Sequence, residues 1–317
     1  MQHSSSFSSP PDLRQFAALV AVAEQGSISA ASSHLGWSDA TVNYHLRNLE
    51  STLGATLLNR SKRGTTPTPI AKQLIPQAKA ALNTASQALE TVLNSAAGRL
   101  PELRLGLFPT AASHLLPRIT RRLRGADFSV QAILAEVSTL EHRFRARELD
   151  AALIFSTPGK NNWRADGVTQ KLVIAEDVLL AVPTIHRFAR RSQISTAELL
   201  ETAEDAWILG SSAPDPLDEM LLQIFAGQQA ALNVRIRTDD YSVALGMVAA
   251  GLAVTTVPRL ACRNVPNGVH LVGLADARFK REISLLLPTE RTALNSEQLE
   301  TLSRAVSAAA NELTEPV

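Results

Sequence analysis

A polar face suited to hydrogen bonding with nucleic-acid bases lies on the segment Asp39–Leu53. It combines hydroxyl, amide, phenol, imidazole and guanidinium groups, and it has no carboxylate between Asp39 and Glu50. Base edges in the major groove are recognised through donors and acceptors of this kind. We therefore expect the segment and its preceding cap to contact DNA. The expected contact residues are Ser38, Asp39, Ala40, Thr41, Asn43, Tyr44 and Arg47, and His45 and Asn48 share the face.

Three cations follow in the short stretch Arg60–Thr66: Arg60, Lys62 and Arg63. With Gly64 among them, the stretch is typical of a hairpin tip. A basic hairpin can lie along phosphates or reach into a minor groove, so it is interpreted as a wing. Two alternatives remain at this point: the cations belong to an ordinary solvated turn, or the helices and hairpin form a protein-binding module.

Two short helices joined by a tight turn are expected to position the polar face. Ser27 is a suitable N-cap for a helix over Ile28–Leu35, Gly36 turns the chain, and the second helix covers Asp39–Leu53. With an amphipathic helix before them, they predict a helix-turn-helix. Ser27 and Ser29, at the start of the first of the pair, are further candidates for DNA contacts.

A long helix is predicted from Pro69 to about Ala97, with Thr68 as its cap and Pro76 as the site of a kink. Apolar residues recur along it in alternating steps of four and three, which favours pairing with another helix in a homodimer. Packing of this seam against the C-terminal part of the same chain is the alternative. The seam residues are Ala71, Ile75, Ala78, Leu82, Ala85, Leu89, Val92 and Ala96.

From Pro101 onward, strand and helix patterns alternate, which predicts an α/β region with a parallel sheet. A first lobe is expected over about 101–175 and 269–317, and a second over about 176–268. Sheets of this type bind ligands in the crevice beyond the carboxyl ends of their strands. The residues expected in that crevice are Thr110, Ser113, Ser138, Thr139, Phe155, Ser156, Gly210, Ser211, Asp240, Tyr241 and Thr256.

Hydroxyl groups at several of these positions precede helices, where free N–H groups favour an anion. Ordinary N-capping explains the same hydroxyls equally well. Asp239 and Asp240 would repel an anion if they faced the crevice, so a cationic or neutral small-molecule effector remains open. No metal site and no cofactor are expected.

Composition restricts the class of protein. The 317 residues are 45% hydrophobic and 19% charged with a net charge of +1, as in a soluble globular protein. No signal peptide or membrane span is recognisable, so a cytoplasmic protein is expected. The only cysteine, Cys262, is interpreted as a packed residue. The motifs of common nucleophiles, phosphate loops and metal sites are missing, which argues against an enzyme, and a transport binding protein would need an export signal.

The sequence resembles the LysR-type transcriptional regulators. The resemblance rests on Leu13–Phe16, Ser27–Ala31, Ser38–Asn43, Leu49-Glu50, Leu53-Gly54 and Leu57–Arg60, continues through Thr66–Pro69, and includes Leu103–Gly106, Glu148–Leu153 and Val248–Ala253. It implies control of promoters, a dimerising linker helix, a homotetramer and an inducer-sensitive C-terminal domain, with RNA polymerase as a further candidate partner. The chain departs from the family where Asp39-Ala40 and Asn43-Tyr44 replace its usual Gln-Pro and Ser-Arg, which leaves the base preference open.

The expected organisation is a winged helix-turn-helix over 1–68, an all-α module apart from its wing, and a linker helix over 69–100. A two-lobed effector-binding domain, of the kind found in periplasmic binding proteins, is expected over 101–317. The expected function is sequence-specific binding of promoter DNA under effector control. Effector identity, operator sequence, the sign of regulation and the choice between dimer and tetramer do not follow from the sequence.

Overall fold

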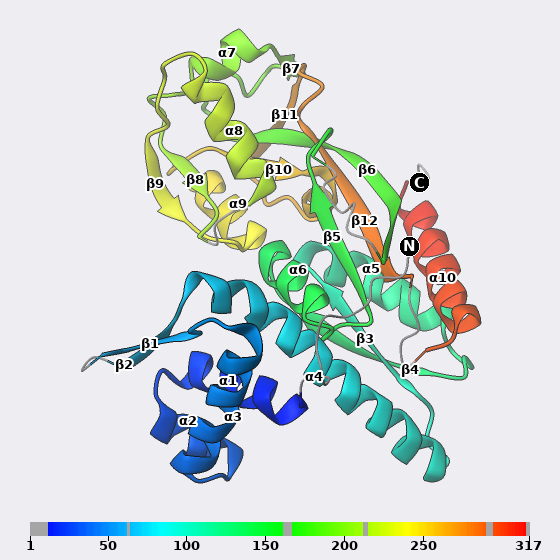
Figure 1. Cartoon of the computed structure of the whole chain (residues 1–317). Helices are drawn as coiled ribbons and strands as arrows, with labels where there is room; N and C mark the ends of the chain where they lie inside the picture. The colour runs from blue at the N-terminus through cyan, green and yellow to red at the C-terminus, as the bar shows by residue number, and fades with distance from the viewer. Residues whose placement is uncertain (1–11, 62–63, 161–166, 212–214, 290–293, 315–317) are drawn as a thin grey trace, which may run out of the picture. The chain divides into compact units, whose positions relative to one another are not determined.

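The computed structural model describes residues 12–61, 64–160, 167–211, 215–289 and 294–314, which form two units (Figure 1). The first unit contains the residues up to 99 and the short segment 143–148. The second contains residues 100–142 and those from 149 onward.

Three capped helices make the core of the first unit: α1 (Leu13–Gln25), α2 (Ile28–Leu35) and α3 (Asp39–Leu53). The side chains of Asp12, Ser27 and Ser38 accept backbone N–H groups at their N-termini, and a glycine with positive φ ends each helix. The left-handed conformation costs glycine little, and α2 and α3 end where the sequence predicts. The buried core includes Leu19, Val22, Val42, Leu46, Leu49 and Leu57.

The predicted hairpin is present as β1 (Leu58–Ser61) and β2 (Gly64–Pro67), which pair antiparallel and extend from the helical core (Figure 1). The backbone N–H of Thr65 donates to the carbonyl of Gly26 at 2.8 Å. This bond fixes the returning strand of the hairpin against the turn between α1 and α2.

Helix α4 (Pro69–Ala96) has Thr68 as its cap and continues through Pro76. The predicted seam has two different environments. Ala71 and Ala78 are fully buried, and Ile75 packs on the core of the three helices. Leu89 and Val92 are 68% and 66% exposed. The N-terminal half of the seam therefore packs within its own unit, and the C-terminal half presents apolar side chains at the surface.

The second unit contains strands and helices in alternation. Its first part has β3 (Glu102–Leu107), α5 (Pro109–Arg122), β4 (Ser129–Leu134), α6 (Val137–Arg145), β5 (Ala151–Ser156), β6 (Val168–Pro183), β7 (Gln193–Ile194), α7 (Thr196–Leu200) and β8 (Trp207–Leu209). Its second part has α8 (Pro216–Ala226), β9 (Val234–Arg237), α9 (Tyr241–Ala249), β10 (Thr255–Pro258), the 3₁₀ helix η1 (Arg259–Arg263), β11 (Val269–Leu274), β12 (Lys280–Pro288) and α10 (Ser296–Thr314).

The main sheet is mixed, which corrects the prediction of a parallel sheet. Its described strands follow the order β4-β3-β5-β12-β6-β11-β7, with β10 also paired to β6. Strands β3, β4 and β5 are parallel, whereas β12 runs antiparallel to both β5 and β6. Parallel neighbours need a crossover connection. The alternating helices supply one between β3, β4 and β5, but no helix separates β11 from β12.

Strand β6 belongs to both lobes of the unit. Its first half pairs with β12 in lobe I, and its second half pairs with β10 and β11 in lobe II. The predicted boundary at which the chain returns to the first lobe, Val269–Val272, therefore lies too early in the sequence. Val269 and Leu271 pack on the lobe II core around Leu245 and Val248, and the chain returns with β12. Helices α5 and α10 pack together in lobe I.

Candidate functional site

The exposed face of α3 has a small group of side chains available to a partner. Tyr44 is 62% exposed, and Ala40 and Arg47 are also exposed. The Ser38 hydroxyl accepts the N–H of Thr41 at 3.1 Å and contacts the Thr41 hydroxyl at 2.8 Å. Both hydroxyls therefore serve the start of the helix as well as its surface.

Asn43 connects α3 to the wing. Its Oδ1 accepts a hydrogen bond from Nη2 of Arg60 at 2.8 Å, and its Nδ2 donates to the carbonyl of Asp39 at 2.9 Å. Both ends of the amide are thus engaged inside the unit. Base readout by Asn43 would require at least one of these bonds to be exchanged.

The other predicted DNA-contact residues either form hydrogen bonds within the unit or lie outside the described residues. Ser27 caps α2, the carbonyl of exposed Ser29 accepts the Ser32 and Ser33 hydroxyls, and exposed Asp39 accepts the Ser32 hydroxyl. Lys62 and Arg63 lie outside the described residues.

His45 corrects the predicted polar face. It is only 6% exposed, and its ring lies 5.3 Å from that of Trp37 and 5.4 Å from that of Tyr44. Positions three and four apart on a helix share a face. His45 therefore sits beside the buried Val42 and Leu49 rather than with Arg47.

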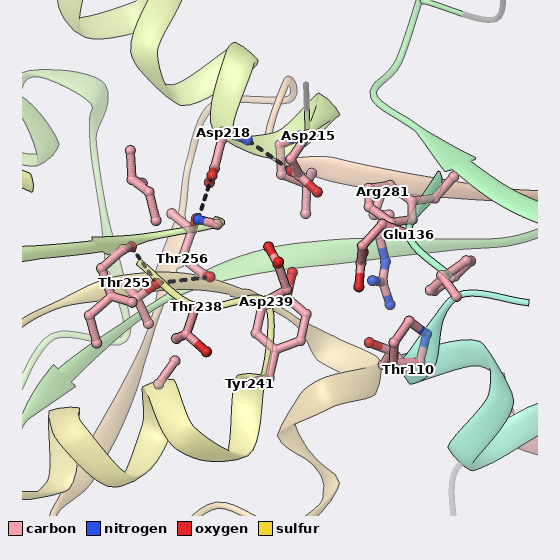
Figure 2. Close-up of a pocket in the computed structure, with 18 residues that line it drawn as sticks. Thr110, Glu136, Asp215, Asp218, Thr238, Asp239, Tyr241, Thr255, Thr256 and Arg281 are labelled. Carbon is pink, nitrogen blue, oxygen red and sulfur yellow. Dashed lines mark hydrogen bonds between the residues drawn. The ribbon is translucent and has the colours of Figure 1, made fainter. Parts of the chain in front are cut away.

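A cavity lies between lobes I and II, and Figure 2 shows the side chains around it. It brings together residues that are far apart in the sequence, including five of the predicted effector contacts. These are Thr110, Phe155, Gly210, Tyr241 and Thr256. The cavity volume is about 50 Å³, which is room for roughly three to five water molecules.

A second, wider cavity of about 540 Å³ shares Thr110 and Tyr241 with the first. Its lining includes two more predicted residues, Ser113 and Asp240. The Asp240 carboxylate also caps α9 by accepting the N–H of Ser242 at 2.7 Å. The two cavities are adjoining parts of one cleft.

Four predicted effector contacts do not line either cavity. Ser138 and Thr139 lie in the first turn of α6, and Ser156 lies at the end of β5. Ser211 donates its hydroxyl to Asp239 at 2.5 Å. Choosing hydroxyl groups only by their position after a strand therefore predicted more effector contacts than line the two cavities.

The first and smaller of the two cavities, called the inner cavity below, is also lined by charged residues that were not selected from the sequence. They are Glu136, Asp215, Asp218 and Arg281, together with Asp239, whose orientation was left open. Burial and then the charges of Asp239 and Asp215 raise the pKa of Glu136 to about 7. Burial and then the charge of Asp215 raise the pKa of Asp218 to about 6.

Arg281 is fully buried on β12. Its Nε donates to Oε1 of Glu176 at 2.8 Å, and its Nη2 lies 2.6 Å from the same oxygen. The guanidinium carbon lies 5.2 Å and 5.1 Å from the ring centres of Phe108 and Phe155. Nη1 is buried and has no hydrogen-bond partner among the described residues. Period-two alternation with Ile283 and Leu285 was the available sequence signal for an inward Arg281.

Other site types were sought in the parts of the chain that the structure describes. No helix there is long and apolar enough to cross a membrane. No group of three or more His, Cys, Asp or Glu residues there is arranged to hold a metal ion.

Known proteins match both units. Residues 13–72 match the family described as bacterial regulatory helix-turn-helix protein, lysR family, and residues 96–310 match the LysR substrate binding domain. A probable hydrogen peroxide-inducible genes activator of Mycobacterium leprae is 31% identical over 259 residues, 79% of each chain. A small neutral protease regulatory protein of Streptomyces coelicolor is 28% identical over 290 residues, 87% of this chain and 85% of that protein.

The fold is similar to that of CbnR, a LysR family transcriptional regulator, with a TM-score of 0.61, 20% identity and coverage of 94% of this chain and 99% of CbnR. Full-length BenM gives a TM-score of 0.56 at 20% identity, with coverage of 96% and 99%. The matched families are those of transcriptional regulators, which confirms the prediction of a regulator rather than an enzyme. The chain therefore belongs to the LysR family and is a DNA-binding transcriptional regulator with an effector-binding domain.

Proposed function

We propose that α3 and the wing form the DNA interface, with Tyr44 and Arg47 approaching base edges and Arg60 approaching a phosphate. Support comes from the exposure of all three side chains and from the bond that holds Arg60 against Asn43. Phosphate contacts fix the register of a protein on DNA, and base contacts provide specificity. Lys62 and Arg63 are assigned to the same phosphate-binding wing from the sequence.

The exposed apolar half of α4 supports a homodimer through this helix. Leu89, Val92 and Leu93 are each about two-thirds exposed, and a sustained apolar stripe of this kind is stabilised by a second helix. Two DNA-binding units in one dimer would address two half-sites. Assembly into a tetramer, contact with RNA polymerase and a cytoplasmic location are further parts of the proposal.

The effector site is assigned to the cleft between the two lobes. The observation that carries this assignment is the convergence of charged and polar groups from both lobes on one cavity. Among them is Nη1 of Arg281, which has no hydrogen-bond partner within the described part of the chain. A buried donor without a partner is costly. A bound effector that accepts its hydrogen bond removes that cost and connects lobe I to lobe II.

Regulation then follows from differential binding. An effector changes DNA binding only if it binds one arrangement of the lobes better than another. The coupling is typically about 1 to 3 kcal/mol.

Sensing of peroxide through a disulfide is a weaker candidate for this chain. Cys262 is its only cysteine, so no intrachain disulfide can form. Burial and the nearby Glu176 charge raise the pKa of the Cys262 thiol to about 12. The thiolate is the reactive form of cysteine, and it is scarce at neutral pH under these conditions.

Selection of bound duplexes from a random pool by the purified full chain tests the DNA-binding proposal. Wild type should enrich one motif, and Tyr44→Ala or Arg47→Ala should lose its central positions. Enrichment of the same motif by both variants would remove these residues from the reading face.

A further inference from the structure

The inner cavity has an excess of negative charge. Four carboxylates line it, from Glu136, Asp215, Asp218 and Asp239. Arg281 is the one cation among the described lining residues, and its charge is already compensated by Glu176 at 2.6 Å. Burial of several charges of one sign close together is costly. The lining therefore favours a ligand that brings positive charge.

Three of the four carboxylates, those of Glu136, Asp215 and Asp218, retain acceptor capacity after their internal bonds are counted. Asp215 accepts the N–H groups of Leu217 and Asp218 on Oδ1, and Asp218 accepts the N–H of Gly210 on Oδ2. The second oxygen of each has no hydrogen-bond partner among the described residues. The Glu136 side chain likewise has none there. Several oxygens thus remain for a donor in the cavity.

Arg281, in contrast to the carboxylates, requires a hydrogen-bond acceptor in the same cavity. Figure 2 shows its guanidinium near Thr110 and Glu136 at one side of the cavity. Phe108 and Phe155 lie against the guanidinium, which restricts its access to water. Its buried Nη1 has no acceptor among the described residues, and a carboxylate is a strong acceptor for a guanidinium. The cavity therefore favours a small ligand that has both hydrogen-bond donors and an acceptor.

A metal ion does not meet these requirements. The carboxylates come from three segments, with Asp215 and Asp218 both at the start of α8. Within the described part of the chain no three acidic, His or Cys groups are grouped as metal ligands. A metal ion would also leave Nη1 of Arg281 without an acceptor.

We infer that the effector is a small cationic amino acid, with its carboxylate on Arg281 and its protonated amines among Glu136, Asp218 and Asp239. This inference rests on the assignment of the cleft as the effector site. The inner cavity fits only the head group. Glu136, Asp239 and Tyr241 line both cavities, so a longer cationic side chain can extend toward Asp240 in the wider one.

Isothermal titration calorimetry on the full chain with L-lysine, L-arginine and L-ornithine tests the inference. At least one should bind. Removing the carboxylate, as in 1,5-diaminopentane, and removing the α-amine, as in 6-aminohexanoate, should each weaken binding by about tenfold or more. Glutarate, with two carboxylates and no amine, should not bind.

Substitutions of the lining residues test where the amino acid binds. Glu136→Gln and Asp218→Asn should each weaken binding of the amino acid by about tenfold or more, because each substitution replaces a carboxylate with a neutral amide of the same shape. Glu219→Gln is the matched control, since Glu219 is exposed, adjoins Asp218 and lines neither cavity. Circular dichroism of each variant verifies that it is folded.

Three results would overturn the inference, and they separate it from the proposed site. Binding of none of the three amino acids rejects the ligand class. Binding of glutarate that is lost in Thr110→Val keeps the cleft as the site and rejects the class. Binding of an amino acid that is unchanged by Glu136→Gln, Asp218→Asn and Thr110→Val rejects the cleft itself.

Discussion

Arg60 in the wing donates a hydrogen bond from Nη2 to Oδ1 of Asn43 in α3 at 2.8 Å. The bond joins the element expected to contact phosphate to the element expected to read bases. Because Asn43 also donates to the Asp39 carbonyl, its amide is better suited to holding Arg60 than to contacting a base.

The two neighbours on α3 should therefore respond differently to mutation. Tyr44→Ala should change the preferred sequence and cost about 1 to 3 kcal/mol on the best site, since it removes an exposed side chain that we propose contacts base edges. Asn43→Ala should lower affinity for all duplexes alike, because Arg60 loses its support. Fluorescence anisotropy on matched and scrambled duplexes, over a range of salt concentrations, distinguishes the two effects.

Arg60→Gln provides the control for this pair. It should reproduce the uniform loss and reduce the salt dependence by the equivalent of about one phosphate contact. A selective loss of the best site in Asn43→Ala, with other duplexes unaffected, would mean that Asn43 exchanges its internal bonds and reads a base.

The exposed end of α4 gives a test of dimerisation. Leu89→Asp combined with Val92→Asp places two charges in the apolar seam and should dissociate the dimer without unfolding the monomer, because both side chains are largely exposed. Sedimentation velocity reports the assembly. Thr84→Asp, also exposed on α4 but outside the seam, should sediment as wild type, and unchanged sedimentation of the double variant would rule out this interface.

Glu136 predicts a specific pH dependence of stability. Its pKa rises from 4.5 to about 7 in the folded chain, so the folded state holds a proton that the unfolded state has lost. The stability from this group is complete below about pH 4.5 and is lost as pH rises through about 7. Glu136→Gln should therefore be more stable than wild type at about pH 8, by roughly 1 to 2 kcal/mol after allowance for solvent screening.

Thermal unfolding at several pH values measures this difference. The groups that face Glu136 also matter: Asp215 and Asp239 raise its pKa, and Asp218, Tyr241 and Arg281 line the same cavity. An equal difference between variant and wild type at about pH 4 and about pH 8 would contradict the linkage.

The same group makes effector binding depend on pH. A cation favours ionised Glu136, so the affinity for L-lysine should increase between about pH 6 and about pH 8, with release of protons on binding at the lower value. Titrations in buffers of different ionisation enthalpy measure the released protons. The increase should be reduced in Glu136→Gln, and its persistence there at full size would assign it to another group.

The helical unit was predictable because its signals are local. Caps and stops such as Ser27, Gly36 and Gly54 act within one turn of the chain, and the bounds of α2 and α3 match the prediction. Burial of His45 was not predictable in this way, because it depends on Trp37 from the preceding turn. The split of the α4 seam between a buried and an exposed half also depends on tertiary packing.

The cavity was predictable only in part, for a similar reason. Thr110 and Tyr241 were found because parallel strands bring their carboxyl ends together. Arg281 was missed because β12 runs antiparallel to its neighbours and enters the cleft from the opposite direction. Asp215 and Asp218 lie at the start of α8, where carboxylates commonly cap a helix, and only the tertiary fold places them in the same cavity lining as Arg281.

The last prediction concerns the coupling between the cleft and DNA binding. Thr110 lines both cavities, whereas Ser138, in the same lobe, lines neither. Thr110→Val should remove most of the effector-induced change in DNA affinity, because the effector can no longer favour one lobe arrangement by its usual 1 to 3 kcal/mol or so. Ser138→Ala also removes a hydroxyl, and it should respond as wild type does. DNA affinity is measured by anisotropy with and without L-lysine, and the affinity without it shows whether either variant has altered the DNA-binding unit. If Ser138→Ala lost the response while Thr110→Val kept it, the helix start at α6 would replace the cleft as the sensor.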